Sequence, residues 1–448
     1  MTKHRLIGVV GLAFVVRAAL PLAALAVTWP QGPLIHEPDS AGYVRLAEEL
    51  VETGRFTVDG RPEIERTPGY VCLLIPGVLS DHIDAVTIAL QCIVGSLTVF
   101  LTFHLALVVF ERASAALAGA IACACEPLSV LYAGKLLSET TFTCAVAAVL
   151  LFLARYLRRG GWRDLVVSAV VLAAAIYVRP IALYLPGVLG VSIVVGRWRQ
   201  CPSRLRLLGQ AAAFIGLAAG PPVAWIARNE MVAGYGRFSA MGDVNLYFWN
   251  AAGVEAARQG QPLADVQRAW GYFSNEIFFE RHPGARGWMA AQRYGFYRVE
   301  ARRILSEAPG TTLAVYLDGI RGTLIDPGTQ AFRDYFREKQ TPVAQLAKGP
   351  TGAWARLRHA LATRPLVVAL HFLLHVVVLG FPALALVGCL TQGNWRRLPV
   401  AILLVTLAYF LLLSGGPAGY HRFRLPLVPI VSVLAGAGWT ALWNWRSN

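Results

Sequence analysis

The stretch that decides the fold, residues 84–110, reads DAVTIALQCIVGSLTVFLTFHLALVVF. It is long enough to cross a bilayer, which takes about 20 predominantly apolar residues in a helix. A backbone inside hydrocarbon must satisfy its own hydrogen bonds, so this stretch is expected to be helical. Comparable stretches lie near residues 6–27, 113–133, 140–155, 164–178, 181–196, 207–227, 365–390, 398–414 and 425–443. We therefore predict an all-α polytopic membrane protein with about ten transmembrane helices.

The composition agrees with a membrane protein. Of the 448 residues, 56% are hydrophobic and only 15% are charged, and the mean hydropathy is +0.51. Soluble domains typically contain about a quarter charged residues. The sequence lacks the short alternating segments of a membrane β-barrel. The net charge of +15 follows partly from membrane topology, so it is no argument for a nucleic-acid partner.

Basic residues give the expected orientation. Arginines gather in short loops on the same side as the N-terminus, which is typical of the cytoplasmic side: Arg112, Arg155, Arg158, Arg159, Arg163, Arg197, Arg199, Arg204, Arg206, Arg396, Arg397 and Arg446. We predict three blocks. Residues 1–230 form a transmembrane block that contains a first outer loop, 28–83; residues 231–364 form an extracytoplasmic segment; and residues 365–448 form the C-terminal transmembrane helices.

The outer regions are predicted to contain further helices. Residues 40–53 place apolar side chains at helical spacing, which favours an amphipathic helix at the membrane interface. Residues 68–79 are apolar but too short to span a bilayer, which indicates an interfacial or re-entrant helix. A helical pattern over 287–307 ends at Ala308-Pro309-Gly310, so segment 231–364 is expected to be mostly helical.

The first outer loop carries the clearest candidates for chemistry, in the sequences EPDS at 37–40 and ERTPGY at 65–70. A carboxylate there can act as the base that takes a proton from a hydroxyl or amine acceptor in a glycosyl transfer. Asp39 is the first candidate for this role and Glu37 the second, although Asp39 can equally be read as a helix N-cap. Arg66 suits a phosphate through paired hydrogen bonds, or it reaches to lipid headgroups without a specific role.

Other ionisable residues lie at the outer ends of the spans. Lys135 and Glu139 are four residues apart, which allows a helical salt bridge. Alternatively, they have a function: Glu139 would bind a sugar hydroxyl or a metal, and Lys135 would counter the charge of a phosphate. Arg179, before Pro180, and the group His421, Arg422 and Arg424 run against the expected charge asymmetry, and the latter three would form a strong anion site.

Together these residues resemble the GT-C glycosyltransferases, a fold that includes protein O-mannosyltransferases and the bacterial aminoarabinose transferase of lipid A. The resemblance extends over most of the chain. Its motifs occur in the expected order: the two first-loop sequences, residues 132–139, Arg179-Pro180, Arg228-Asn229, GRF at 236–238, NLYFWN at 245–250 and YHRFRLPLVP at 420–429.

The resemblance implies a GT-C-like bundle that transfers a sugar from a polyprenyl-phosphate donor to a lipid, glycan or protein acceptor. The reaction is expected outside the bacterial cytoplasmic membrane, with inversion at the anomeric carbon, and Asp39 matches the acid that acts as base or positions the acceptor. Basic residues at outer loop ends would hold the lipid phosphate: Arg66, Lys135, Arg179, Arg422 and Arg424. The candidates for substrate binding are Tyr43, Tyr70, Glu139, Arg228, Asn245, Tyr247, Asn250 and His421.

The chain departs from the family at one point. Many members carry two adjacent acids in the first loop, whereas here Pro38 separates Glu37 from Asp39. A divalent metal, for which Asp39 and Glu139 are the candidates, therefore stays open. Two other functions compete: a transporter or flippase of a lipid-linked saccharide, and a ligase or polymerase with a lipid diphosphate donor. A transporter should place its charges near the bilayer midplane with repeat symmetry, so the outer charges favour the transferase.

Overall fold

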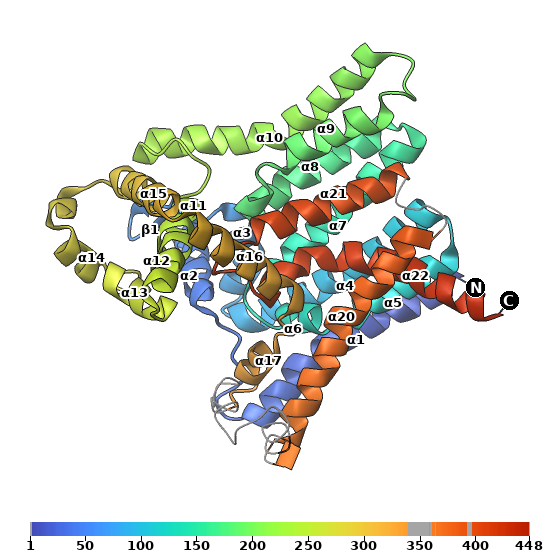
Figure 1. The fold of residues 1–448 in the computed structure, drawn as a ribbon, viewed down its shortest axis with the longest axis horizontal. Helices are drawn as coiled ribbons and strands as arrows, with labels where there is room; N and C mark the ends of the chain where they lie inside the picture. The colour runs from blue at the N-terminus through green and yellow to red at the C-terminus, as the bar shows by residue number, and fades with distance from the viewer. Residues whose placement is uncertain (1, 339–357, 359–360, 363, 392–396, 448) are drawn as a thin grey trace.

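The computed structural model describes residues 2–338, 358, 361–362, 364–391 and 397–447. It is a bundle of long helices with a mostly helical segment at one end (Figure 1). The bundle comprises α1 (Thr2–Thr28), α4 (Ile83–Phe110), α5 (Ala113–Ala124), α6 (Pro127–Ala133), α7 (Glu139–Arg159), α8 (Trp162–Val178), α9 (Leu185–Arg197), α10 (Arg204–Ala233), α20 (Pro365–Leu390), α21 (Leu398–Leu413) and α22 (Val428–Ser447). The predicted all-α polytopic fold is confirmed.

Each predicted span corresponds to a helix or to a bent pair of helices. Among the described residues, seven helices are long and apolar enough to cross a membrane, or eight if α5 and α6 form one span. The other two, α8 and α21, contain 17 and 16 residues and fall where spans 164–178 and 398–414 are predicted. The multi-pass architecture follows from these long apolar helices.

One predicted span, 113–133, is broken. The structure bends by 54° between α5 and α6, where the continuous apolar run predicts one helix. Pro127 is the first residue of α6 and Glu126 is its N-cap, whose carboxylate accepts a hydrogen bond from the Ser129 backbone at 2.6 Å. Because a proline lacks the N–H and disfavours a helical residue before it, the Glu126-Pro127 pair ends α5.

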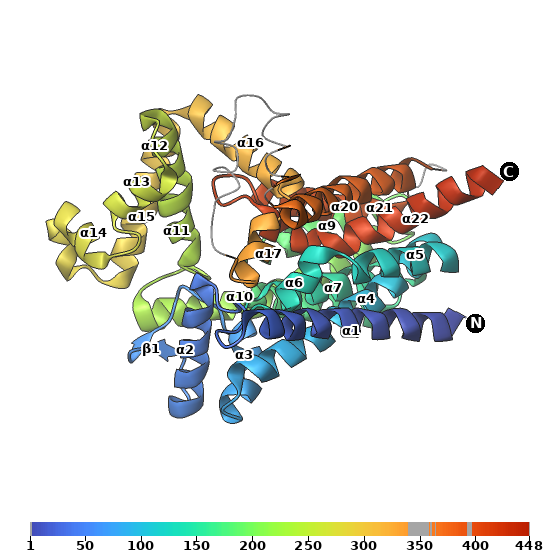
Figure 2. The ribbon, with the colours of Figure 1, turned by 90° about the horizontal axis from the view of Figure 1, so that it is seen from below.

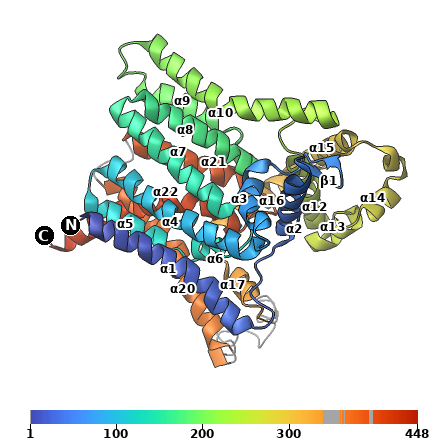
Figure 3. The ribbon, with the colours of Figure 1, turned by 180° about the vertical axis from the view of Figure 1, so that it is seen from behind.

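Both chain termini lie at the same end of the bundle, as the predicted topology requires (Figure 2). The first loop and the segment that follows α10 lie at the opposite end, which we call the loop end. Helix α1 lies along the outside of the bundle against α4 and α5 (Figure 3). Arg396, one of the arginines used to assign the orientation, lies outside the described residues.

The first loop folds into α2 (Pro38–Thr53), a small hairpin of β1 (Thr57–Val58) and β2 (Arg61–Pro62), and α3 (Pro68–Leu79). The two helices fall where residues 40–53 and 68–79 predict them. Helix α2 ends at Gly54, whose φ of +67° is a left-handed conformation that glycine adopts without strain. The hairpin turns at Asp59 and Gly60, both with positive φ, which is the conformation of a type I′ turn.

The segment after α10 forms a second, smaller core beside the bundle. Tyr247, Trp270 and Tyr297 stack at its centre, and Ile64 of the first loop is buried in the same cluster. The predicted helix 287–307 is α15. The elements are α11 (Met241–Asn245), η2 (Leu246–Ala251), α12 (Ala252–Gln259), α13 (Leu263–Trp270), α14 (Asn275–Arg281), η3 (Pro283–Gly287), α15 (Ala290–Glu307), α16 (Pro309–Ile325) and α17 (Thr329–Tyr335). Residues 339–357, 359–360 and 363 of the predicted segment lie outside the described residues.

Candidate active site

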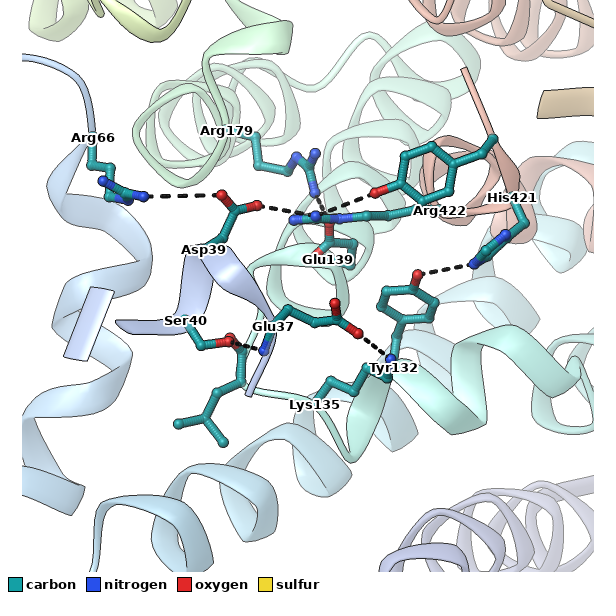
Figure 4. A network of polar contacts seen from close by, with 12 residues as sticks. Glu37, Asp39, Ser40, Arg66, Tyr132, Lys135, Glu139, Arg179, His421 and Arg422 are labelled. Carbon is teal, nitrogen blue, oxygen red and sulfur yellow. Dashed lines mark hydrogen bonds and ion pairs between the residues drawn. The ribbon is translucent and has the colours of Figure 1, made fainter. Parts of the chain in front are cut away.

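Charged side chains from five separate parts of the chain meet at the loop end of the bundle (Figure 4). They come from the start of α2, the residues before α3, the turn between α6 and α7, the end of α8, and the short helix η5 (His421–Leu427). We call them the charge cluster and define it by seven residues: Glu37, Asp39, Arg66, Lys135, Glu139, Arg179 and Arg422. All seven were predicted from the sequence as site residues.

Asp39 lies between two guanidinium groups. One carboxylate oxygen accepts a hydrogen bond from Arg422 Nη1 at 3.0 Å, and the other lies 3.9 Å from Arg66 Nη2. The N-cap of α2 is Glu37, so the alternative reading of Asp39 as a helix cap is wrong. The Asp39 side chain remains 43% exposed, and of the carboxylates in the charge cluster it is the one a substrate can reach most easily.

Glu139 occupies the buried end of the cluster. It is the first residue of α7, its side chain is fully buried, and one carboxylate oxygen accepts hydrogen bonds from both Arg179 and Arg422. The other carboxylate oxygen has no hydrogen-bond partner among the described residues. Because Arg422 also binds Asp39, one guanidinium connects the exposed acid to the buried one.

Lys135 pairs with Glu37, so the predicted helical salt bridge between Lys135 and Glu139 is wrong. The physical reason is that α6 ends at Ala133 and α7 begins at Glu139, so Lys135 lies in a turn and not on a helix with Glu139. The ammonium group is buried in this turn. Gln91 of α4 fixes the turn by donating to the Lys135 carbonyl at 2.7 Å.

Two tyrosines support the cluster from α2 and α3. Tyr70 is fully buried and donates a hydrogen bond to Gln91 at 3.0 Å, which ties α3 to the turn that carries Lys135. Tyr43 packs its ring edge-on against Tyr70, with centroids 4.9 Å apart, and lies 5.5 Å from the guanidinium of Arg66. Burial raises the pKa of Tyr43, so its hydroxyl stays protonated at neutral pH.

His421 connects the cluster to the second core. Its Nδ1 lies 2.7 Å from the carboxylate of Asp326, and its Nε2 lies 3.2 Å from the Tyr132 hydroxyl. Burial opposes ionisation of Asp326, but the hydrogen bond and charge interaction with His421 and the backbone hydrogen bonds from Gly328 and His421 together outweigh it and lower the pKa of this carboxyl to about 2. The ionised Asp326 therefore accepts a hydrogen bond from Nδ1 and fixes the orientation of the imidazole ring. Asp326 was not predicted, because nothing near it in sequence links it to His421.

Comparison with known proteins agrees with this architecture. Residues 69–225 match the family described as dolichyl-phosphate-mannose-protein mannosyltransferase. The archaeal oligosaccharyltransferase AglB from Archaeoglobus fulgidus, in complex with an inhibitory peptide and a dolichol-phosphate, superposes on the whole chain with a TM-score of 0.57 at 13% identity. This chain has the GT-C fold. The resemblance predicted from the sequence is thereby confirmed.

The GT-C chain spans about half of that oligosaccharyltransferase, 51% of its length. The apo form of the A. fulgidus enzyme is similar with a TM-score of 0.55, 14% identity and the same coverage of both chains. ArnT from Cupriavidus metallidurans bound to undecaprenyl phosphate has a TM-score of 0.40 and 18% identity, with 95% of this chain and 77% of that chain covered. No curated protein matches the chain by sequence.

Five other residues predicted from the GT-C resemblance lie outside the charge cluster. Arg424 donates to the carbonyls of Thr323 and Asp326, at 2.9 and 3.0 Å. Tyr247 is buried in the second core, between Trp270 and Tyr297. The remaining three are Asn245, which is exposed, Asn250, whose amide oxygen lies against Gly416, and Arg228. Their predicted roles in substrate binding remain predictions.

Arg228 holds the strand segment that leads to the cluster. It donates to the carbonyls of Glu63 and Phe56, at 2.6 and 3.1 Å, and the Glu63 carboxylate in turn accepts from the backbone of Arg66 at 2.8 Å. The two Arg228 contacts tie α10 to the first loop, and the third contact lies within the loop. Arg228 therefore fixes the backbone from which Arg66 reaches Asp39.

Arg228→Lys is expected to destabilise the protein by about 1.5–3 kcal/mol, because an ammonium group cannot bridge two carbonyls as the guanidinium does. The thermal unfolding temperature in detergent measures this loss. Arg237→Lys is the matched control. Arg237 lies nearby, its side chain is 46% exposed, and its ion pair with Asp243 is long, at 4.0 Å. The unfolding temperature of this variant should therefore stay near that of the wild type. Equal unfolding temperatures for the two variants would contradict the role of Arg228.

The residues of the cluster do not fit a divalent metal in this arrangement. The Asp39 and Glu139 carboxylates, the two candidates, both accept hydrogen bonds from the cationic Arg422. Within the described ranges, no three His, Cys, Asp or Glu side chains converge as a metal site requires. Two guanidinium groups at this position favour an anionic ligand over a cation.

Proposed function

We propose that this GT-C protein is a glycosyltransferase that moves a sugar from a polyprenyl-phosphate donor to an acceptor at the loop end of the bundle. The observation that carries the proposal is Asp39, a half-exposed carboxylate placed between Arg66 and Arg422 beside a fully buried Glu139. An exposed base next to fixed cations is what transfer from a lipid phosphate requires. The family match over residues 69–225 supports the same reaction class.

Asp39 is the proposed base. In an inverting transfer the acceptor oxygen or nitrogen attacks the anomeric carbon as the bond from that carbon to the phosphate oxygen breaks. The acceptor proton goes to the Asp39 carboxylate, and the electron pair of the broken bond stays on the lipid phosphate. Its ion pairs with Arg66 and Arg422 hold the carboxylate in one orientation, which serves the positioning that this step needs.

The charge of the cluster suits the proposed donor. Two of its cations, Arg66 and Lys135, and the bridging Arg422 lie around the exposed acids, and the seven groups together carry four positive and three negative charges. The net positive charge matches the single negative charge of a sugar phosphodiester. As the sugar leaves, negative charge grows on the lipid phosphate, and fixed cations in a water-poor site stabilise that change.

The remaining residues of the site act through these groups. Glu139 holds Arg179 and Arg422 in place from the buried side. His421 and Tyr132 border the cluster, and the ring of Tyr43 lies beside the Arg66 guanidinium from α2. We assign Tyr43, Tyr132 and His421 to positioning the sugar and the phosphate. Arg179 contributes positive charge from behind Arg422, through its ion pair with Glu139.

The proposed setting is the bacterial cytoplasmic membrane, with the loop end facing the periplasm or the cell exterior. The basic loops at the end with the termini support this orientation. The second core lies at the same end of the bundle as the site and is the expected contact for the acceptor, whether lipid, glycan or protein. Mass spectrometry of the glycolipids, wall glycans and exported proteins of a deletion strain would identify the acceptor by the sugar it lacks.

The decisive test measures whether undecaprenyl phosphate is released from the sugar donor. Purified protein is incubated with a panel of undecaprenyl-phosphate hexoses and pentoses and with membrane extract as the acceptor source. A transferase releases undecaprenyl phosphate in step with glycosylated acceptor. A flippase moves the intact donor across liposomes without releasing its phosphate, and a ligase or polymerase accepts only the diphosphate-linked donor; either result would refute the proposal.

Arg66→Ala is expected to weaken binding of undecaprenyl phosphate by roughly 10–100-fold, the size of one hydrogen bond to a charged group. Binding is measured by the concentration at which undecaprenyl phosphate raises the thermal unfolding temperature. Arg61→Ala, which removes an exposed arginine from the same loop, should leave this concentration unchanged. Once the acceptor is known, its KM should change less than donor binding; equal losses for both substrates would argue against a phosphate role.

A further inference from the structure

Arg17 is an unusual buried cation in α1. It lies near the middle of the candidate span His4–Thr28, and its side chain is turned into the bundle with 1% of its surface exposed. A charged side chain at this depth is costly and usually has a partner of opposite charge. Gly95 of α4 leaves the space for it, because a Cβ there would collide with the Arg17 guanidinium.

All the hydrogen-bond partners of Arg17 among the described residues are neutral. Its two terminal nitrogens donate to the carbonyls of Ala13, Cys123 and Ala124, at 3.1–3.4 Å, and to the Ser129 hydroxyl at 3.1 Å. No ion pair to Arg17 occurs in the part of the chain that the structure describes, and its Nε has no hydrogen-bond partner there. The hydrogen bonds of Arg17 therefore bring no negative charge into direct contact with the guanidinium.

The nearby carboxylate of Glu126 does not form an ion pair that would compensate the charge of Arg17. It accepts from the Ser129 backbone at 2.6 Å and so reaches Arg17 only through Ser129. The same carboxylate also acts electrostatically on the buried Arg424, together with the carboxylate of Asp326. Glu126 is thus shared between two guanidinium groups, and among the described residues it forms an ion pair with neither of them.

A cavity lies beside the unpartnered nitrogen. Arg17, Gly95, Thr140 and Thr143 are among its lining residues, and it has room for about one water-sized sphere. The hydroxyls of Thr140 and Thr143 are buried and, like Arg17 Nε, have no hydrogen-bond partner among the described residues. The cavity therefore collects one charged donor and two neutral donors, and no lining carboxylate opposes them.

We propose that this cavity binds a small monovalent anion of the halide class, such as chloride. Arg17 Nε and the hydroxyls of Thr140 and Thr143 would donate to it. A water molecule would satisfy the hydrogen bonds but leave the charge of Arg17 uncompensated, whereas a halide satisfies both. The site is one helical turn or less from Glu139 along α7, so the bound ion would stabilise the bundle directly beneath the charge cluster. The proposal does not depend on the transferase function.

The test uses the full chain in detergent or nanodiscs, dialysed into sodium gluconate and then titrated with sodium chloride at constant ionic strength. Ligand binding to the folded state raises the unfolding temperature in a saturable way, here by roughly 2–4 °C. Thr140→Val/Thr143→Val, which removes two donors at nearly constant shape, should abolish the rise. Thr141→Val is the matched control, because Thr141 also has an unpartnered hydroxyl on α7 but does not line the cavity; it should retain the rise.

Two results would overturn the proposal. Equal unfolding temperatures in gluconate and chloride for the wild type would mean that the cavity holds water. An identical chloride effect in the double valine variant would mean an adventitious ion only. Should the double variant not fold, wild-type crystals grown in bromide decide the question, since an anomalous peak beside Arg17 Nε supports the site and its absence refutes it.

Discussion

Asp39→Asn is expected to lower the turnover number for sugar transfer by roughly 10²–10⁴-fold, the usual contribution of a general base. Asparagine keeps the shape of the side chain but cannot take up the acceptor proton. The loss should appear in kcat, because the amide oxygen can still accept the hydrogen bond that Arg422 donates at 3.0 Å. Donor binding, measured with undecaprenyl phosphate, should change much less.

Asp59→Asn is the matched control for this prediction. Asp59 lies in the same loop, is 68% exposed and pairs with Arg45 at the hairpin turn, away from the charge cluster. Its positive φ of 52° is a conformation that asparagine tolerates, so folding should be unaffected. Both variants are compared by turnover and by unfolding temperature. Near wild-type turnover in well-folded Asp39→Asn protein would remove Asp39 from the role of base.

The fold was predictable because its signals are local. A run of about 20 apolar residues predicts a spanning helix wherever it occurs, and each run near the predicted positions is helical. The positions of α2 and α3 followed from apolar spacing and, for α3, from the proline at its first turn, whereas α2 begins two residues before the predicted start, at Pro38. The break before Pro127 was equally local, but the apolar run around it concealed the signal. The Asp59-Gly60 pair is a further local signal, because Asp-Gly is typical of a type I′ hairpin turn.

The site was predictable as a set of residues but not as a set of contacts. Asp39 and Arg422 are 383 positions apart, and they meet because η5 packs against α7 while α2 is joined to the turn before α7. The i,i+4 rule predicted the wrong partner for Lys135, because it assumes a helix where the chain makes a turn. Arg17 was the opposite case: a lone arginine inside a span is a signal that the sequence offers without any packing information.

Glu139→Gln is expected to destabilise the protein by about 3–5 kcal/mol, the cost of removing one partner from a buried ion pair. The side chain is fully buried and neutralises two guanidinium groups, those of Arg179 and Arg422, which are themselves 17% and 14% exposed. Glutamine can accept a hydrogen bond but carries no charge, so both cations would be left partly uncompensated. The thermal unfolding temperature in detergent should fall accordingly, and with it the fraction of protein that binds donor.

Glu111→Gln separates this effect from the general loss of a carboxylate. Glu111 pairs with Arg158 near the end of the bundle that carries the termini, but it is 69% exposed, so its loss should cost only about 0–1 kcal/mol. In Glu139→Gln/Arg179→Met one of the stranded cations is also removed, so part of the lost stability should return, a coupling that independent sites do not show. If Glu139→Gln unfolds at the temperature of Glu111→Gln, the buried carboxylate does not hold the two arginines, and the proposed support of Asp39 through Arg422 is lost with it.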